Sequence, residues 1–374
     1  MQGPTLSYKK TDGHMLRPYR YGYSFTIAAL SLLSACSAQR DQISGSSFVP
    51  TAEPQGSPHN GGPVIKEYAV KSKKIGQIFD LAFDAAKNLW FNSYSPYVGR
   101  MTPGGLITVH PLPRKRNSYG LESVNSMAFG PGQNIWFTDF LGKEIGTIDR
   151  KGTIREYQPF QKTGYAFTNS LLPRPLHVWV TMDIFDTGYI AEANQRAKVV
   201  RAIYLPGYFC YPGPITADKT GTFWIGNSGN CPKITRVTPD GKVRDFAIKA
   251  ADGVWGIAAG PDGNIWFTAA DNPTTNDYVG KITPTGKITT YPITNQADGI
   301  ALGPDGNWWI TMPFVGKIES MNLQGKIVAE YTLPNAINGS QPEFQACLIH
   351  RGPDGNMWFG EGARNKIGEL IFSK

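Results

Sequence analysis

Short runs of alternating apolar and polar residues, separated by turn segments, recur along most of this chain. In one copy, residues 254–259 are small and apolar, and residues 265–268 are aromatic and β-branched. Residues 278–282 form a third run, and residues 287–293 alternate polar with apolar positions, as an exposed strand does. Pro-Asp-Gly and Thr-Pro-x-Gly segments between the runs supply the positive φ and fixed corners that tight turns require. The pattern predicts an all-β chain with four short strands per unit.

Seven tryptophans mark a repeat of this unit, at intervals of 46, 43, 45, 42, 43 and 49 residues. They are Trp90, Trp136, Trp179, Trp224, Trp266, Trp309 and Trp358. A period in the low forties with four strands per unit is typical of a β-propeller blade. The repeat therefore predicts a seven-bladed β-propeller, with the tryptophans as core residues between blades. The third copy is the most diverged, because its turn has become Pro173-Arg174-Pro175.

The two ends of the repeat region indicate how the ring closes. Residues 64–70 have the pattern of an outer strand, and the last copy ends at residues 367–372 with only its third strand. We expect these two segments to pair, because pairing removes two exposed sheet edges that would invite aggregation.

The N-terminal part has a different character. Residues 25–35 are an apolar run preceded by four Lys or Arg, too short to span a bilayer and typical of a signal peptide. The run ends in Leu-Ser-Ala-Cys36, which resembles a bacterial lipobox, in which the cysteine carries the lipid; an ordinary signal peptide with an incidental cysteine is the alternative. Met15 is an alternative start to Met1. We therefore divide the chain into a lipoprotein signal peptide (1–35), a lipidated Cys36 with a flexible tether (36–62) and the propeller (63–374).

Charge and export narrow the range of partners. The formal net charge is +8, but residues 1–35 hold four Lys or Arg and one Asp, which leaves a value near +5 for the rest. Neither a dense basic helix nor an aromatic RNA-binding signature occurs, so we expect no nucleic-acid partner. We expect an exported monomer, anchored by lipid to the cell envelope. If the cell is Gram-negative, Ser37 after the cysteine points to the periplasmic side of the outer membrane.

The other cysteines are Cys210, Cys231 and Cys347. Cys210 precedes the inner strand of the fourth blade and Cys231 follows its second strand, so both lie on the same face of a propeller. A Cys210–Cys231 disulfide is plausible in an oxidising compartment, and two free thiols are the alternative. No spacing typical of a zinc site occurs.

The repeat resembles that of the virginiamycin B lyase (streptogramin lyase) family over essentially the whole propeller. The resemblance rests on Gly-Pro-Asp-Gly-Asn-Ile-Trp-Phe-Thr followed by Val-Gly-Lys-Ile-Thr-Pro-Thr-Gly-Lys-Ile-Thr-Thr-Tyr-Pro-Ile. It implies a seven-bladed enzyme that opens the ester ring of a depsipeptide antibiotic by elimination, with a divalent metal, usually Mg²⁺. This chemistry needs a base that removes the proton α to a carbonyl and an electrophile that supports the enolate. In the family, histidines at the start of inner strands and glutamates just after Trp-Phe-Thr carry these roles.

The residues of this chain depart from the family at those positions. The position eleven residues before each anchor tryptophan, where the family places its histidine, is occupied by Phe79, Asn125, Thr168, Gly213, Trp255, Asp298 and Cys347. The position three residues after it, where glutamate recurs, is occupied by Ser93, Asp139, Met182, Asn227, Ala269, Met312 and Glu361. Only Glu361 is retained, with Asp139 as a shorter analogue. Of the histidines after Cys36, His350 comes nearest, but it lies eight residues before Trp358, which is the opposite strand parity.

Each candidate site residue has a structural alternative. Trp255, at the mouth of an inner strand, is a candidate for stacking against a ligand. Asp139, Asp298 and Glu361 are weak candidates for catalysis or for metal binding, since an acidic loop residue is usually just solvated, and His350 is a weak catalytic candidate. Asp298 is also a candidate for ligand binding. Arg364 is expected to pair with Glu361, and contact with an anionic ligand is the alternative.

The absent histidines favour one function over two others. We expect a membrane-tethered lyase-like propeller that binds a small molecule, peptide or glycan without the family's lyase activity. The alternatives are an active metal-dependent C–O lyase or hydrolase with a rebuilt carboxylate site, and a protein-interaction scaffold. The ligand is expected at the channel mouth, on the face where the inner strands begin, because concave sites with convergent polar groups are the usual binding places.

Overall fold

The computed structural model describes residues 62–93, 95–113, 124–139, 144–159, 166–249, 252–270, 277–334, 336 and 345–373. The chain divides into the units Met1–Asp41 and Gln42–Lys374, and all described residues belong to the second. The predicted signal peptide, Cys36 and nearly all of the tether lie outside the described residues. Among the described residues, no helix has the length and apolar character needed to cross a membrane.

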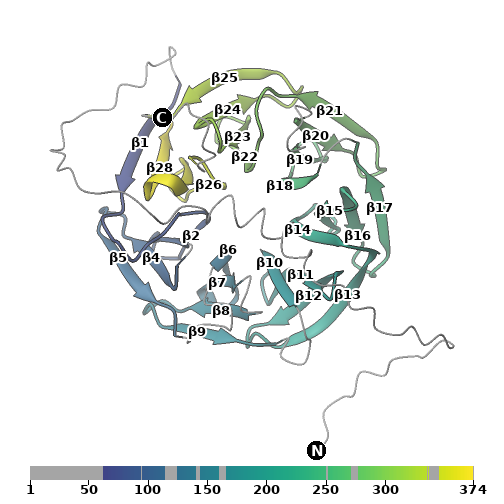
Figure 1. Cartoon of the computed structure of the whole chain (residues 1–374), viewed down its shortest axis with the longest axis horizontal. Helices are drawn as coiled ribbons and strands as arrows, with labels where there is room; N and C mark the ends of the chain where they lie inside the picture. Colours follow the sequence, from purple (N-terminus) through teal and green to yellow (C-terminus); the bar gives the residue numbers. More distant parts are fainter. Residues whose placement is uncertain are drawn as a thin grey trace, which may run out of the picture. The chain divides into compact units, whose positions relative to one another are not determined.

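The second unit is a ring of antiparallel blades, each with four strands (Figure 1). The fourth and fifth blades are joined into one eight-stranded sheet by the pairing of Ser228 with Gly253. The first blade holds β2 (Leu81–Phe83), β3 (Leu89–Phe91), β4 (Tyr97–Met101) and β5 (Ile107–Pro111). The second holds β6 (Val124–Gly130), β7 (Asn134–Asp139), β8 (Glu144–Ile148) and β9 (Ile154–Tyr157). The third holds β10 (Ala166–Pro173), β11 (His177–Ile184), β12 (Thr187–Asn194) and β13 (Val199–Tyr208). The fourth holds β14 (Cys210–Ala217), β15 (Phe223–Gly229), β16 (Lys233–Val237) and β17 (Val243–Ala247).

The remaining blades complete the ring. The fifth holds β18 (Gly253–Ala259), β19 (Ile265–Ala270), β20 (Tyr278–Ile282) and β21 (Ile288–Pro292). The sixth holds β22 (Ile300–Leu302), β23 (Trp308–Met312), β24 (Lys317–Met321) and β25 (Ile327–Thr332). The seventh holds β26 (Ile349–Arg351), β27 (Met357–Glu361), β28 (Lys366–Ile371) and, as its outer strand, β1 (Val64–Ala69). Two short 3-10 turns, Pro131–Gln133 and Gly362–Arg364, interrupt this all-β pattern.

The predicted ring closure is confirmed. β1 pairs antiparallel with β28 from Val64 opposite Ile371 to Ala69 opposite Lys366, so the two chain ends share one blade. The all-β, seven-bladed architecture is therefore the one that the repeat predicts. The diverged third blade carries the longest outer strand of the ring, since β13 spans ten residues.

The anchor tryptophans are core residues, with 0–6 % of their surface exposed. In six of them the indole N–H donates to the turn that precedes the strand, and in Trp136 the acceptor is the Pro131 carbonyl oxygen. The aspartate of that turn accepts the bond in five blades: Asp84 for Trp90, Asp218 for Trp224, Asp262 for Trp266, Asp305 for Trp309 and Asp354 for Trp358. The turn aspartate thus serves the core as well as the turn, because a buried indole needs an acceptor.

The threonine of Trp-Phe-Thr ties neighbouring blades together around the channel. Thr268 Oγ1 accepts a hydrogen bond from Gly256 N in its own inner strand (2.8 Å) and donates to Asp298 O of the next blade (2.6 Å). Thr138 and Thr181 repeat both contacts, and Asn92 makes the equivalent bridge in the first blade. These bonds hold the entrances of the inner strands in place, and the candidate site is built there.

Candidate site at the channel mouth

The face at which the inner strands begin, called here the entrance face, gathers most of the predicted site residues. Asp139 ends β7 opposite Val124 at the start of β6, and Glu361 ends β27. Trp255 lies near the start of β18, and Asp298 lies just before β22. Strand direction therefore places all four at one end of the ring, as the propeller topology predicted.

Trp255 is half-buried and occupies a bulge. The register of β18 against β19 shifts between Val254 and Gly256, which leaves Trp255 outside the regular pairing. Its Nε1 atom is buried and has no hydrogen-bond partner within the described residues. A buried donor without an acceptor is uncommon and needs an explanation, such as a bound molecule.

Asp298 lies just before the inner strand of the neighbouring blade and is almost fully buried, with 8 % of its surface exposed. The two segments are in close contact, since a Cβ added to Gly256 would lie 2.5 Å from the Asp298 carbonyl oxygen. The Oδ2 atom of Asp298 has no partner in the described part of the chain. Burial, with a smaller contribution from the negative charge of Asp80, raises the pKa of Asp298 to about 7. Near neutral pH this carboxyl can therefore donate or accept a hydrogen bond.

Asp80, at the entrance of the first blade, is hydrogen-bonded to both the seventh and the second blade. Its Oδ1 atom lies 2.6 Å from Nε2 of His350 on β26, and its Oδ2 atom accepts a hydrogen bond from Met127 N on β6 at 2.8 Å. Asp80 is 2 % exposed, whereas the His350 side chain is 38 % exposed. An imidazole oriented by a buried carboxylate is the arrangement that general-base catalysis uses. The same contact also acts as a tie between the first and last blades.

Glu361 is the most deeply buried of the candidates. It is fully buried, and neither carboxylate oxygen has a hydrogen-bond partner among the described residues. Burial, and then the charge of Glu67, raise its pKa to about 8, while Lys366 and Arg364 act in the opposite direction. The expectation that the acidic rim residues are solvated is wrong, because Asp139, with 1 % exposed, and Asp298 are buried as well.

The predicted Arg364–Glu361 pairing is not among the described ion pairs. Arg364 Nη1 instead donates a hydrogen bond to the Pro334 carbonyl oxygen at 2.8 Å, and it affects Glu361 only through its charge. Nor are Asp139, Asp298 and Glu361 brought together as ligands. Within the described ranges, no group of three His, Cys, Asp or Glu side chains is placed to hold a metal ion.

Cys210 and Cys231 form a disulfide with a Cα–Cα distance of 5.4 Å, and Cys347 is a buried free cysteine. The bridge joins the start of β14 to the loop after β15, on the entrance face.

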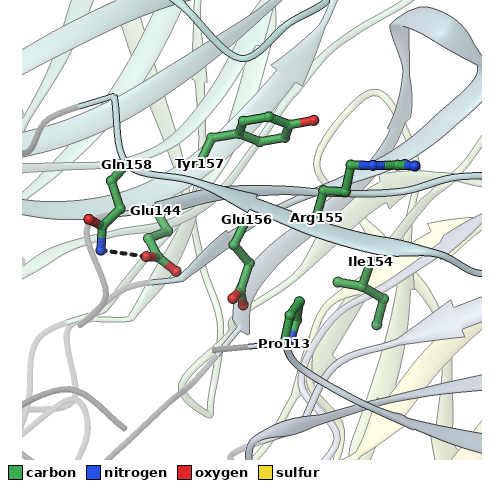
Figure 2. A pocket seen from close by; sticks show the side chains of 7 residues that line it. All are labelled: Pro113, Glu144, Ile154, Arg155, Glu156, Tyr157 and Gln158. Atoms are coloured by element: carbon green, nitrogen blue, oxygen red, sulfur yellow. Dashed lines mark hydrogen bonds between the residues drawn. The ribbon is translucent and has the colours of Figure 1, made fainter. Parts of the chain in front are cut away.

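One described hollow lies away from the channel mouth. It has a volume of about 660 Å³ and is lined by Pro113, Glu144, Ile154, Arg155, Glu156, Tyr157 and Gln158 (Figure 2). Five of these residues lie on or next to β9, the outer strand of the second blade, so the hollow belongs to the circumference of the ring. Gln158 Nε2 donates a hydrogen bond to Glu144 Oε1 across it (2.7 Å).

Sequence reasoning missed Asp80. Asp80 lies ten residues before Trp90, whereas the position compared between blades is eleven residues before each anchor tryptophan. Only the closure of the ring brings Asp80 into contact with His350, which lies 270 residues later in the chain. An acidic residue at the entrance of an inner strand was the available signal.

Comparison with known proteins agrees with this architecture. The model of the virginiamycin B lyase family matches residues 172–373, more than half of the chain. The chain belongs to the virginiamycin B lyase family. The virginiamycin B lyase of Nocardia farcinica (strain IFM 10152) is 25 % identical over 227 residues, which cover 58 % of this chain and 70 % of that protein.

Solved structures show the same fold. Selenomethionine-substituted virginiamycin B lyase from Staphylococcus aureus has a TM-score of 0.68 at 24 % identity, covering 83 % of this chain and 99 % of that one. A catalytically inactive variant of the Staphylococcus aureus enzyme, crystallised with quinupristin, has a TM-score of 0.69 at 22 % identity with the same coverage. The WD40 β-propeller domain of Doa1 has a TM-score of 0.62 at 14 % identity, over 83 % of this chain and 98 % of its own. These similarities establish the fold of this family member.

Proposed function

We propose that this member of the virginiamycin B lyase family binds a small molecule, peptide or glycan at the channel mouth and lacks the family's lyase activity. The observation that carries the proposal is the pair of buried polar atoms at the entrances of adjacent inner strands, Trp255 Nε1 and Asp298 Oδ2, neither of which has a described partner. An indole N–H and a carboxyl with a raised pKa, at the entrances of neighbouring blades, suit a ligand group that both accepts and donates, such as an amide or a hydroxyl. The indole face adds apolar area for stacking.

Truncating Trp255 to Ala is expected to weaken ligand binding by about 1–3 kcal/mol, as loss of an aromatic anchor does. The measurement is calorimetric titration of residues 37–374 with virginiamycin B as a cyclic depsipeptide probe and chitotriose as a glycan probe. Phe129→Ala is the matched control, because Phe129 is a partly exposed aromatic residue at the opposite end of an inner strand. Equal binding by the Trp255 and Phe129 variants, or no binding of either probe by the unaltered protein, would contradict the proposal.

A second candidate function is supported by the His350–Asp80 contact. In this case His350 removes the proton α to a carbonyl, and Asp298, protonated near neutral pH, donates a proton to the leaving oxygen. The reaction would be an elimination at a carbon–oxygen bond on a rebuilt site.

Incubating residues 37–374 with virginiamycin B and Mg²⁺ separates the two candidates. We expect no linearisation by mass spectrometry at a rate near that of the family, because the family's histidine positions are occupied by other residues. Rapid linearisation that is abolished in His350→Gln would establish the second candidate instead. Linearisation that survives this substitution would overturn both.

We also propose that the protein is anchored in the cell envelope through a lipid on Cys36. Replacing Cys36 by Ser should abolish lipidation and leave the protein soluble or as an unprocessed precursor. Membrane fractionation with metabolic lipid labelling measures this. A processed Cys36→Ser protein that still sediments with the membrane would show that another anchor acts.

A further inference from the structure

A second group of acidic and aromatic residues, of which Asp183 is buried, lies on the entrance face where the third and fourth blades meet. Asp183 is near the end of β11, and Asp186 lies in the turn before β12. Tyr208 ends β13, and Tyr211 is the second residue of β14. We call these four residues the Asp183 cluster. It belongs to other blades than Trp255 and Asp298, so a ligand site in this cluster is independent of the proposed function.

Asp183 has an unused carboxylate oxygen. The residue is 2 % exposed, and Oδ1 accepts a hydrogen bond from Asp186 N at 3.2 Å, but Oδ2 is buried with no partner among the described residues. None of the described ion pairs involves Asp183 or Asp186. Lys233, held nearby on β16, is already bound to Asp245 at 2.8 Å and to the Pro206 carbonyl oxygen.

Two carboxyls without a described cation create a negative potential at this point. Burial, and then the charge of Asp186, raise the pKa of Asp183 to about 7. Burial, and then the charges of Asp186 and Asp183, raise the pKa of Tyr211 to about 12. The hydrogen bond from Phe209 N to the Asp186 carbonyl oxygen, at 3.0 Å, brings the segment that leads to Tyr211 against Asp186.

Aromatic rings form the exposed side of the cluster. The Tyr208 and Phe209 rings are in contact edge to face, with centroids 4.1 Å apart, and Tyr208 is 65 % exposed. Phe185 in the adjacent turn is 57 % exposed. Exposed aromatic faces beside carboxylates attract organic cations, because the ring quadrupole and the negative charge act in the same direction.

The backbone around the cluster is held in place. Phe209 N donates to the Asp186 carbonyl oxygen, and Asn230 N donates to the Phe209 carbonyl oxygen, both at 3.0 Å. The Cys210–Cys231 disulfide also joins the segment of Phe209 to the segment of Asn230. Asp186 and Phe209 have positive φ values of 61° and 58°, a conformation that costs free energy in a residue other than glycine and persists only where the surroundings impose it.

We propose that the Asp183 cluster binds the ammonium group of a small organic cation, with the nitrogen against Asp183 and Asp186 and its substituents against Tyr208 and Phe209. A divalent metal fits less well, since within the described residues no third His, Cys, Asp or Glu completes a ligand set. A hydrated metal ion would also gain little from the aromatic rings, whereas the alkyl groups of an organic ammonium contact them directly.

Calorimetric titration of residues 37–374 with choline tests the proposal, with 3,3-dimethyl-1-butanol as the uncharged analogue of the same shape. We expect choline to bind and the analogue not to bind. Asp183→Asn should weaken choline binding about tenfold, and Tyr208→Leu, which keeps the apolar bulk but removes the ring, should weaken it severalfold. Asp240→Asn, in an exposed turn on the opposite face, should leave it unchanged, as should Trp255→Ala.

Three results would overturn the proposal. They are equal binding of choline and its uncharged analogue, choline binding that is unaffected by Asp183→Asn, and binding of Ca²⁺ in the absence of choline binding. Thermal melting of each variant verifies that it is folded, and Asp183→Asn is expected to fold because it replaces an unpaired buried carboxyl by a neutral group.

Discussion

Raising the pH from about 4 to about 8 should lower the free energy of unfolding of this propeller by several kcal/mol. Four buried carboxyls have raised pKa values in the folded state: Asp183, Asp298 and Glu319 to about 7, and Glu361 to about 8. The folded state therefore binds more protons than the unfolded state between the ordinary carboxyl pKa and these values. The stabilisation that these four protonated carboxyls contribute is fully present below about pH 4. It is lost as the pH rises through their folded-state pKa values of 7 to 8.

Two members of this set, Asp298 and Glu361, allow a sharp test. A displacement of about three pH units corresponds to about 4 kcal/mol, and relaxation of the surroundings reduces this, so we expect about 2–3 kcal/mol each for Asp298 and Glu361. Glu361→Gln should match the unaltered protein in urea unfolding at pH 4 and exceed it in stability by that amount at pH 8. Asp240→Asn is the control, because its exposed carboxyl has a pKa near 2 and does not titrate in this range. A Glu361→Gln protein that is less stable at both pH values would show that the carboxylate has a structural partner.

Gly280→Ala should destabilise the propeller by about 3 kcal/mol. In the repeat, the glycine of the third strand faces the phenylalanine that follows the anchor tryptophan, and a Cβ at Gly280 would lie 2.1 Å from Cζ of Phe267. Gly99, Gly146 and Gly368 are in the same contact with Phe91, Phe137 and Phe359. Because the ring is fully buried, it cannot move without displacing its neighbours, and such overpacking typically costs about 1–3 kcal/mol or more.

Urea unfolding of Gly280→Ala beside Gly104→Ala measures this effect. Gly104 lies in an exposed turn, has no positive φ, and would place a Cβ 3.9 Å from its nearest neighbour, so its substitution should change stability by less than about 0.5 kcal/mol. Adding Phe267→Leu should recover part of the loss in Gly280→Ala, since the smaller side chain leaves room for the methyl group. Equal stability of the two glycine variants would show that the contact between the glycine and the ring is not tight.

The sequence alone was sufficient for the fold because each element of the repeat is chemically explicit. The spacing of Trp266 and its counterparts defines the blades, and the unpaired strand patterns at residues 64–70 and 367–372 define the closure. The blades and the closure can both be read from short stretches of sequence, because they depend on strand period, turn residues and the need to cover sheet edges. The family could be recognised for the same reason, since its repeat is continuous along the chain.

The sequence predicted the chemistry of the entrance face less completely than the fold. Comparing equivalent positions between blades identified Trp255, Asp298 and Glu361, but it could not identify the Asp80–His350 contact, which joins positions that are not equivalent in the repeat. It also treated the acidic residues as solvated, although Glu361 and Asp139 are buried.

The sequence by itself determined the number of blades, the strand order and the end of the ring at which the candidate residues lie. Only the tertiary structure decided which side chains at that end are buried, which polar atoms are left without partners and which charges lie close together. The reason is physical: strand and turn formation depend on neighbours in the chain, whereas burial, hydrogen-bond satisfaction and pKa depend on neighbours in space, and in a closed ring these come from blades hundreds of residues apart.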